Sequence, residues 1–296
     1  MKKAVKFHMI EKDLELRNKL RLLSDVDSHA TVRILVVWSI SAWLIAGAAA
    51  AARAERPSHP LAAGVRVIVS AVREAAAEND VAAERLCGDR LTEYLVRRAA
   101  AAAKNLSEED AAKAFLLGLG AAIDGSTVLR AAPLMNEVFL AAENEDERRQ
   151  RLAVLGAPTL HGRRDLAQHF VVSAALAILI GPEAAETMGT MKEMRDSQGG
   201  SGFSFFDLAA DMAGIAFANH VREKKLSLES LAESFTVADF MPKIGNLPEG
   251  IPSEAFLKRY GSIWDDRFIQ HRSEIRRQVL SLPGYHSRCD ETGSPE

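Results

Sequence analysis

Titratable residues recur at helical spacing between Gly162 and Ala218, and their types suit acid–base chemistry or cation binding. Asp165 and His169 are four residues apart, and so are Asp207 and Asp211. Residues three or four apart share one face of an α-helix, so each pair projects to the same side. Each pair adjoins a strongly apolar run, which indicates that these faces are buried.

A third group lies between these two pairs in the sequence. Glu193 and Asp196 are three residues apart and follow Lys192. A buried carboxylate that has no partner destabilises the fold by several kcal/mol. Each of these acids therefore needs a cation, a proton or a hydrogen-bond donor close to it.

One hypothesis for the titratable residues is a cation site. Carboxylate oxygens together with one imidazole suit Mg²⁺, Mn²⁺ or non-haem iron, so a divalent metal is the cofactor to expect. The candidate metal ligands are His169, Glu193, Asp207 and Asp211. A related hypothesis assigns acid–base catalysis to His169, Glu193 and Asp211, with a carboxylate tuning the pKa of the imidazole.

The alternative is a purely structural polar network. Its members would be Asp165, Lys192, Asp196 and Ser204, with His169 and Asp211 as a hydrogen-bonded pair that fixes the register of two helices. Asp165 would lie in the first turn of its helix, where the helix dipole favours an acid. Ser204 would begin a helix and form a capping box with Asp207, three residues later.

Known motifs do not decide between these hypotheses. The sequence contains no HExxH, GxSxG or P-loop pattern. Residues 197–202, "SQGGSG", are predicted to form a tight loop before the next helix. A glycine-rich stretch in this position could also receive an anion at the helix N-terminus.

The elements that must position these residues are predicted to be helices. Of the 296 residues, 48% are hydrophobic but only 6% are aromatic, and Ala and Leu, both strong helix formers, dominate. No alternating pattern predicts a strand. The fold class expected is all-α, a multi-helix globular bundle with a polar cluster between helices. The expected helices span 61–79, 81–104, 108–122, 126–142, 145–155, 163–180, 182–195, 205–223, 227–235, 253–260 and 266–280.

The N-terminal region carries the pattern of an export signal. Residues 34–52 contain no charge, Arg33 precedes them, and Ala52 and Ala54 flank Arg53. A basic start, an apolar segment and an Ala-x-Ala site are typical of a cleaved signal peptide. We therefore predict a periplasmic or exported protein. In the alternative, this segment is retained as an inner-membrane anchor, which is the only membrane contact expected.

The rest of the chain is expected to divide into successive helical regions. The expected divisions are 1–54 (leader and signal peptide), 55–155 (helical N-terminal region), 156–225 (helical core with the titratable pairs), 226–285 (C-terminal helical region) and 286–296 (disordered tail). In an oxidising compartment Cys87 and Cys289 could form a disulfide, and two free thiols are the alternative. The net charge of −3 gives no basic footprint, so no nucleic-acid partner is expected.

Three separated motifs carry a resemblance to a known family. They are D-x-A-Q-H-F-x-x-S-A, then K-E-x-x-D-S, then G-S-G-F-S-x-x-D followed by D-x-A-G. The residues concerned are Asp165, Ala167, Gln168, His169, Phe170, Ser173, Ala174, Lys192, Glu193, Asp196, Ser197, Gly200, Ser201, Gly202, Ser204, Asp207, Asp211, Ala213 and Gly214. This region, about 162–215, resembles the YfiM-type putative lipoprotein family of bacterial envelopes. The resemblance implies an envelope location and no particular activity. Unlike that family, this chain has no lipid-attachment cysteine after its signal, and long segments flank the motifs.

Two functions from different classes follow. The first is an exported envelope protein that binds a partner or has a structural role without catalysis. The alternative is a metal-dependent or acid–base hydrolase that acts on an envelope ester or phosphate. Titratable side chains that converge on an open cleft would favour the enzyme, whereas a sealed and mutually paired cluster would favour the first function.

Overall fold

The computed structural model describes residues 60–286, except 132, 244 and 246. This part of the chain contains thirteen α-helices and no β-strand, which confirms the predicted all-α fold. The apolar segment 34–52, Cys289 and nearly all of the predicted tail lie outside the described residues. Cys87 is exposed.

The first half of the described chain forms six helices. They are α3 (Pro60–Asp80), α4 (Gly88–Ala103), α5 (Glu108–Ile123), α6 (Val128–Ala131), α7 (Pro133–Ala142) and α8 (Glu145–Val154). Close approach of α3 and α5 depends on a small residue, because a Cβ on Gly118 would lie 2.4 Å from the Cβ of Ile68. The expected helices 61–79, 108–122 and 145–155 are confirmed to within one residue at each end.

Two predicted helices in this half are wrong. The helix expected at 81–104 begins only at Gly88, whose φ of +57° is left-handed and incompatible with an α-helix running through it. The Asn79 side chain instead holds a turn by bonding both the N–H and the C=O of Leu86. The helix expected at 126–142 is two helices, and the second starts at Pro133, which has no N–H to continue the first.

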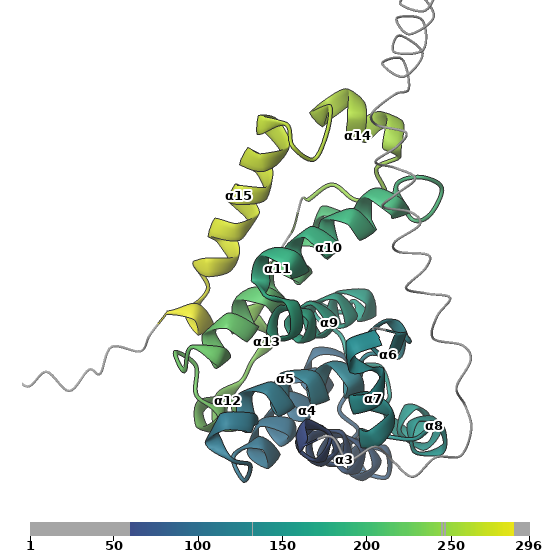
Figure 1. Ribbon diagram of the computed structural model, residues 1–296, viewed down its shortest axis with the longest axis vertical. Helices are drawn as coiled ribbons and strands as arrows, with labels where there is room; N and C mark the ends of the chain where they lie inside the picture. Colours follow the sequence, from purple (N-terminus) through teal and green to yellow (C-terminus); the bar gives the residue numbers. More distant parts are fainter. Residues whose placement is uncertain (1–59, 132, 244, 246, 287–296) are drawn as a thin grey trace, which may run out of the picture. The chain divides into compact units, whose positions relative to one another are not determined.

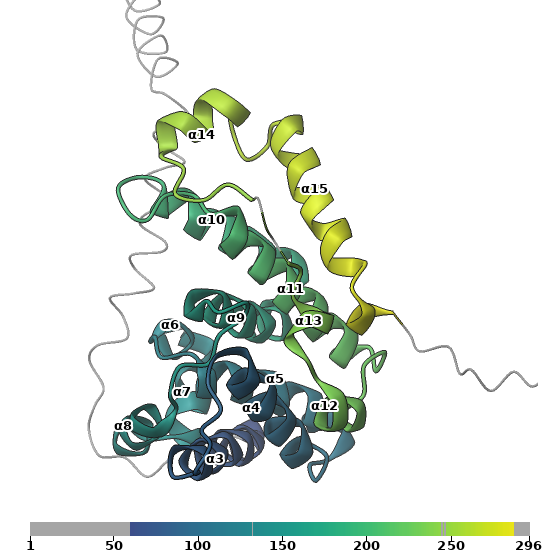
Figure 2. The ribbon, with the colours of Figure 1, turned by 180° about the vertical axis from the view of Figure 1, so that it is seen from behind.

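Three more helices follow and form the middle of the molecule. They are α9 (Arg164–Ile180), α10 (Pro182–Asp196) and α11 (Phe205–Arg222). Helix α9 lies between α5 and α11 in both ribbon views (Figures 1 and 2). Its contact with α11 is very close, because a Cβ on Gly214 would lie 2.1 Å from the backbone oxygen of Phe170. The predicted bounds of all three helices are confirmed to within one residue.

The last part of the described chain covers α11. It contains α12 (Leu228–Ser234), α13 (Val237–Phe240), α14 (Ser253–Tyr260), α15 (Asp266–Leu280) and a 3₁₀ turn (Pro283–Tyr285). The four-residue α13 was not among the predicted helices. Aromatic rings join α14 and α15 to the start of α11, where Phe203 lies 4.7 Å from Phe256 and 5.8 Å from Phe268 between ring centroids.

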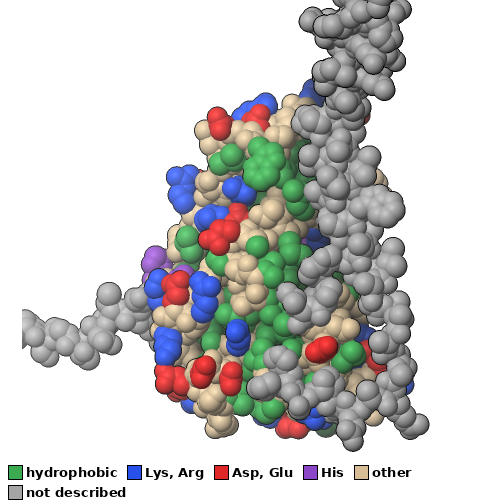
Figure 3. Space-filling view, viewed as in Figure 1, with side chains coloured by type: hydrophobic (Ala, Val, Ile, Leu, Met, Phe, Trp, Pro, Cys, Tyr) green, Lys and Arg blue, Asp and Glu red, His purple; other side chains and the backbone are tan. Residues whose placement is uncertain are grey.

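These elements share one hydrophobic core. Its buried side chains run from Ala62 to Tyr285, so the described helices of both halves contribute to it. None of the described helices is both long and apolar enough to cross a membrane. On the face seen in Figure 3, acidic and basic side chains alternate around a band of apolar ones, and neither sign of charge forms a continuous surface there.

Candidate functional site

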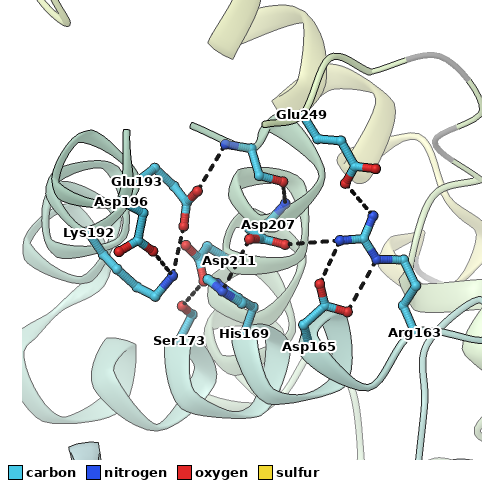
Figure 4. Close-up of polar contacts among 11 residues, drawn as sticks. Arg163, Asp165, His169, Ser173, Lys192, Glu193, Asp196, Asp207, Asp211 and Glu249 are labelled. Carbon is cyan, nitrogen blue, oxygen red and sulfur yellow. Dashed lines mark hydrogen bonds and ion pairs between the residues drawn. The ribbon is translucent and has the colours of Figure 1, made fainter. Parts of the chain in front are cut away.

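Helices α9, α10 and α11 bring the predicted site residues together (Figure 4). We call the group formed by His169, Ser173, Lys192, Glu193, Asp207 and Asp211 the histidine cluster. Each of the three helices contributes two members, His169 and Ser173 from α9, Lys192 and Glu193 from α10, and Asp207 and Asp211 from α11. The α9 and α11 pairs are four residues apart, so the two members of each lie on one helix face. The close α9–α11 contact at Gly214 brings the two outer pairs within bonding distance.

Two side chains fix the orientation of the imidazole. His169 Nδ1 donates to Asp211 Oδ1 at 2.9 Å. Ser173, one turn along α9, donates its hydroxyl to the same oxygen at 2.6 Å. The other ring nitrogen, Nε2, lies 3.6 Å from Asp207 Oδ2. The bond to Asp211 therefore leaves Nε2 facing a second carboxylate.

Both carboxylate oxygens of Glu193 have partners. Oε2 accepts the backbone N–H of Ser204 at 3.0 Å. Oε1 accepts from Lys192 Nζ at 3.0 Å, and the same Nζ donates to Asp196 at 2.8 Å. The start of α11 is thereby tied to α10, although Glu193 has no exposed surface.

The N-terminus of α11 is only half of the capping box expected. Ser204 does accept the backbone N–H of Asp207 at 3.1 Å. In a complete box the Asp207 side chain would accept the backbone N–H of Ser204. That N–H bonds Glu193 instead, which leaves the Asp207 carboxylate free to face His169.

The histidine cluster is buried and has too few hydrogen-bond donors for its carboxylate oxygens. Asp207 is 8% exposed and Asp211 is 2% exposed. Asp207 Oδ1 and Asp211 Oδ2 are buried with no hydrogen-bond partner. Buried oxygens of this kind are uncommon in folded proteins, and an ion or ordered water is a usual explanation.

Burial and neighbouring charges shift the pKa values in the cluster. Burial raises the pKa of both Glu193 and Asp207. Burial alone would lower the pKa of His169, but the charge of Asp211 and its hydrogen bond outweigh this and raise it to about 9. Without another cation, the imidazole therefore holds a proton that partly neutralises the surrounding carboxylates.

Three of the four predicted metal ligands meet at one point. One ligand atom from each of His169, Glu193 and Asp207 lies within 4.8 Å of the others. Asp211, the fourth predicted ligand, stands behind the imidazole and bonds its far nitrogen. The predicted catalytic set of His169, Glu193 and Asp211 is likewise close together, with Asp211 in an orienting position.

Asp165 belongs to a neighbouring ion-pair group rather than to the cluster itself. The Arg163 guanidinium donates two hydrogen bonds to Asp165, the shorter at 2.6 Å. It donates a third to Glu249, also at 2.6 Å. Its Nη2 lies 3.8 Å from Asp207 Oδ1, beyond hydrogen-bonding distance. Arg163 thus links the loop at Glu249 to the edge of the cluster (Figure 4).

Two residues that complete the site were given no role from the sequence, although Ser173 belongs to the motifs that carry the family resemblance. Ser173 lies four residues after His169, on the same helix face. Gly189 lies four residues before Glu193, and a Cβ there would be 2.5 Å from Asp211 Oδ2. The spacing of four was the available signal for both.

The arrangement resembles a prepared metal site in its chemistry. Metal-binding histidines usually donate their second ring N–H to a carboxylate, which fixes the ring and makes it a better ligand. Here Asp211 provides that carboxylate, and Nε2 lies 3.6 Å from Asp207 Oδ2. Models of known protein families, curated proteins and solved structures were all compared with this chain, and none of them matches it.

Proposed function

We propose that this chain is an exported envelope protein whose histidine cluster binds one divalent cation. The observation that carries the proposal is the convergence of ligand atoms from His169, Glu193 and Asp207 within 4.8 Å. The second ring nitrogen of His169 is already held by Asp211, so a cation would meet an oriented imidazole.

The charge balance of the cluster supports a cation. Glu193, Asp207 and Asp211 bring three buried carboxylates together, against one imidazole and the half-exposed ammonium of Lys192. Two of their oxygens have no donor. A divalent cation would supply the missing positive charge, and the mixed oxygen and nitrogen ligands favour Mn²⁺, Fe²⁺ or Zn²⁺ over Ca²⁺.

Binding fits this site better than hydrolysis does. The side chains of His169 and Asp207 are each only 11% exposed, and Glu193 has no exposed surface. A substrate needs access to the reacting atoms, whereas a single ion does not. The alternative function, hydrolysis of an envelope ester or phosphate, would require the cluster to open.

The proposed envelope location rests on residues 34–54 and on the resemblance of residues 162–215 to YfiM-type proteins. The N-terminal sequence of the protein isolated from its native host tests this part. A chain that begins at Glu55 supports cleavage after Ala54. A chain that keeps residues 34–52 and fractionates with membranes would make it an anchored protein.

The metal content of the full-length chain, purified without chelator, tests the cation site. We expect near-stoichiometric Mn, Fe or Zn in the unaltered protein and in His286→Ala, which removes an exposed histidine far along the sequence. His169→Ala should lose the metal. If the unaltered protein neither contains a metal nor binds added Mn²⁺, the cluster is a structural network only.

The same metal-loaded protein separates binding from catalysis. Hydrolysis of a simple phosphate or carboxylate ester that requires Mn²⁺ and His169 would replace the binding proposal by the hydrolase. Absence of turnover with bound metal is the result that we expect.

A further inference from the structure

Each oxygen of Glu193 already accepts a hydrogen bond, and the Lys192 donor is also a positive charge that repels an incoming cation. Its Oε2 accepts the backbone N–H of Ser204, and its Oε1 accepts from Lys192 Nζ, both at 3.0 Å. The Ser204 bond belongs to the start of α11, so releasing it would loosen the helix terminus. The Lys192 bond is the one that can be given up without changing the fold.

Lys192 has a second hydrogen-bond partner, which it can keep when its bond to Glu193 breaks. Its ammonium donates to Asp196 at 2.8 Å, four residues further along α10. The side chain of Lys192 is half exposed, and that of Asp196 is 29% exposed. A lysine ammonium is a compact charge on a flexible stem, so it can swing outward to Asp196 and water while α10 stays in place.

We infer that Lys192 is a specificity-determining residue, an internal cation that holds Glu193 Oε1 until a divalent ion displaces it. The inference rests on the proposed function, because it concerns the same three ligands. Lys192 and the incoming ion compete for one oxygen (Figure 4). The net gain on binding is therefore the ion's interaction with the cluster minus the lost Lys192–Glu193 bond.

This competition selects among cations. Mn²⁺ and Zn²⁺ gain a strong bond to the imidazole nitrogen in addition to the carboxylates, which compensates for displacing the lysine. Mg²⁺ prefers oxygen ligands and gives up its waters reluctantly, so it gains less from His169. Lys192 should thus exclude Mg²⁺ more effectively than it excludes Mn²⁺.

Calorimetric titration of the full-length Lys192→Met variant with Mn²⁺ and with Mg²⁺ tests the inference. We expect Mn²⁺ to bind about ten-fold more tightly than to the unaltered protein, because one competing charge at a partly exposed position is removed. Weak Mg²⁺ binding should appear in this variant. Arg195→Met removes the same charge from an exposed position on α10 and should change either affinity by less than about two-fold.

A double-mutant cycle tests the role of Asp196. Asp196→Asn removes the carboxylate that accepts Lys192 when the ion binds. This variant should bind Mn²⁺ about five-fold more weakly. In the Lys192→Met background the same substitution should have almost no effect, since Asp196 acts through the lysine. An equal effect in both backgrounds would mean that Asp196 acts on the ion directly, and it would overturn this part of the inference.

The outcomes separate the inference from the proposed function. If the unaltered protein binds Mn²⁺ and Lys192→Met binds it equally or less tightly, Lys192 is no competitor and the inference fails while the cation site stands. If only Lys192→Met binds Mn²⁺, the lysine excludes the ion from the unaltered protein, so the inference stands while the proposed function fails. If no variant binds Mn²⁺, the proposed function fails, and this inference fails with it.

Discussion

Two groups of buried charges lie in different regions of this molecule, and they are matched in different ways. One is the histidine cluster between α9, α10 and α11. The other, which we call the arginine network, consists of Arg130 on α6, Glu143 after α7 and Arg151 on α8. Helices α6, α7 and α8 lie together on the side of the molecule away from α14 and α15 (Figure 2).

The arginine network is closed. Arg151 is fully buried, and its Nε and Nη2 donate to the two oxygens of Glu143 at 2.7 and 3.0 Å. Arg130 also bonds Glu143, and Arg151 donates to the backbone oxygen of Ala122 on α5. Among the buried atoms of these three described residues, none is without a partner.

The histidine cluster is open, in the sense that some of its buried atoms lack hydrogen-bond partners. It contains more carboxylates than cations, and an oxygen of Asp207 and one of Asp211 have no donor. A closed buried network specifies how helices dock, whereas one that lacks positive charge has capacity for a ligand. Burial of charge alone therefore does not distinguish the two groups, whereas the unmatched carboxylate oxygens of the histidine cluster do.

The largest effect is expected from breaking the closed network. Arg151→Leu leaves Glu143 buried with one arginine fewer, which should lower the free energy of unfolding by about 3–5 kcal/mol. Urea unfolding followed by circular dichroism measures it. Arg149→Leu, on the same helix with a side chain 73% exposed, should stay within about 0.5 kcal/mol. A loss below about 1 kcal/mol in Arg151→Leu would show that the network is dispensable.

The two regions also differ in what the sequence allowed us to predict. The histidine cluster was predicted because its charged residues interrupt apolar runs at a spacing of four, as Asp207 and Asp211 do. Arg151 lies in "EDERRQRLAV", where every neighbour suggests a solvated helix. Its burial depends on α5 and Glu143, which lie next to it only in the folded chain.

Helix positions followed from local pattern, and their interruptions did not. The bounds of α9, α10 and α11 agree with the sequence because Pro182 and the residues around Ser204 mark where helices begin. The late start of α4 depends on a left-handed Gly88, a conformation that the sequence permits without requiring it. Likewise, the orienting position of Asp211 depends on the distance between α9 and α11. The spacing of residues along one helix does not determine that distance.

Binding of a divalent cation to the histidine cluster should raise the free energy of unfolding. A substitution away from that cluster should leave this gain unchanged. At Mn²⁺ concentrations 100-fold above the dissociation constant, the unaltered protein should gain about 2.7 kcal/mol in the free energy of unfolding. Asp207→Asn, which removes a ligand, should gain almost nothing. Arg149→Leu should gain as much as the unaltered protein does. An equal gain in Asp207→Asn would mean that Mn²⁺ binds elsewhere.

Alkaline pH should weaken the histidine cluster of the metal-free protein. His169 has a raised pKa of about 9, so its contribution is complete below its unfolded value near 6.5 and is lost as the pH rises through about 9. Relative to His169→Gln, the unaltered protein should lose about 3 kcal/mol of unfolding free energy between pH 6 and pH 9.5. Urea unfolding with chelator at several pH values measures the difference. A constant difference would mean that folding does not raise the pKa of His169.

The smallest effect on stability, and the sharpest test of the cluster's geometry, is expected from Gly189→Ala. The new Cβ would lie 2.5 Å from Asp211 Oδ2, so the carboxylate must move, which disturbs its bond to His169. Alanine favours the helix by about 1 kcal/mol, while overpacking costs about 1–3 kcal/mol, so the net loss should be about 1 kcal/mol.

The affinity of this variant for Mn²⁺ should fall much further than its stability, by about ten-fold or more, because the carboxylate that orients a metal-binding histidine is displaced. Met188→Ala, at an exposed position next to Gly189, is the matched control and should leave affinity unchanged. If Gly189→Ala is more stable and binds Mn²⁺ as tightly as the unaltered protein, Asp211 does not orient His169 for a ligand. The open cluster would then differ from the closed network only in its count of hydrogen bonds.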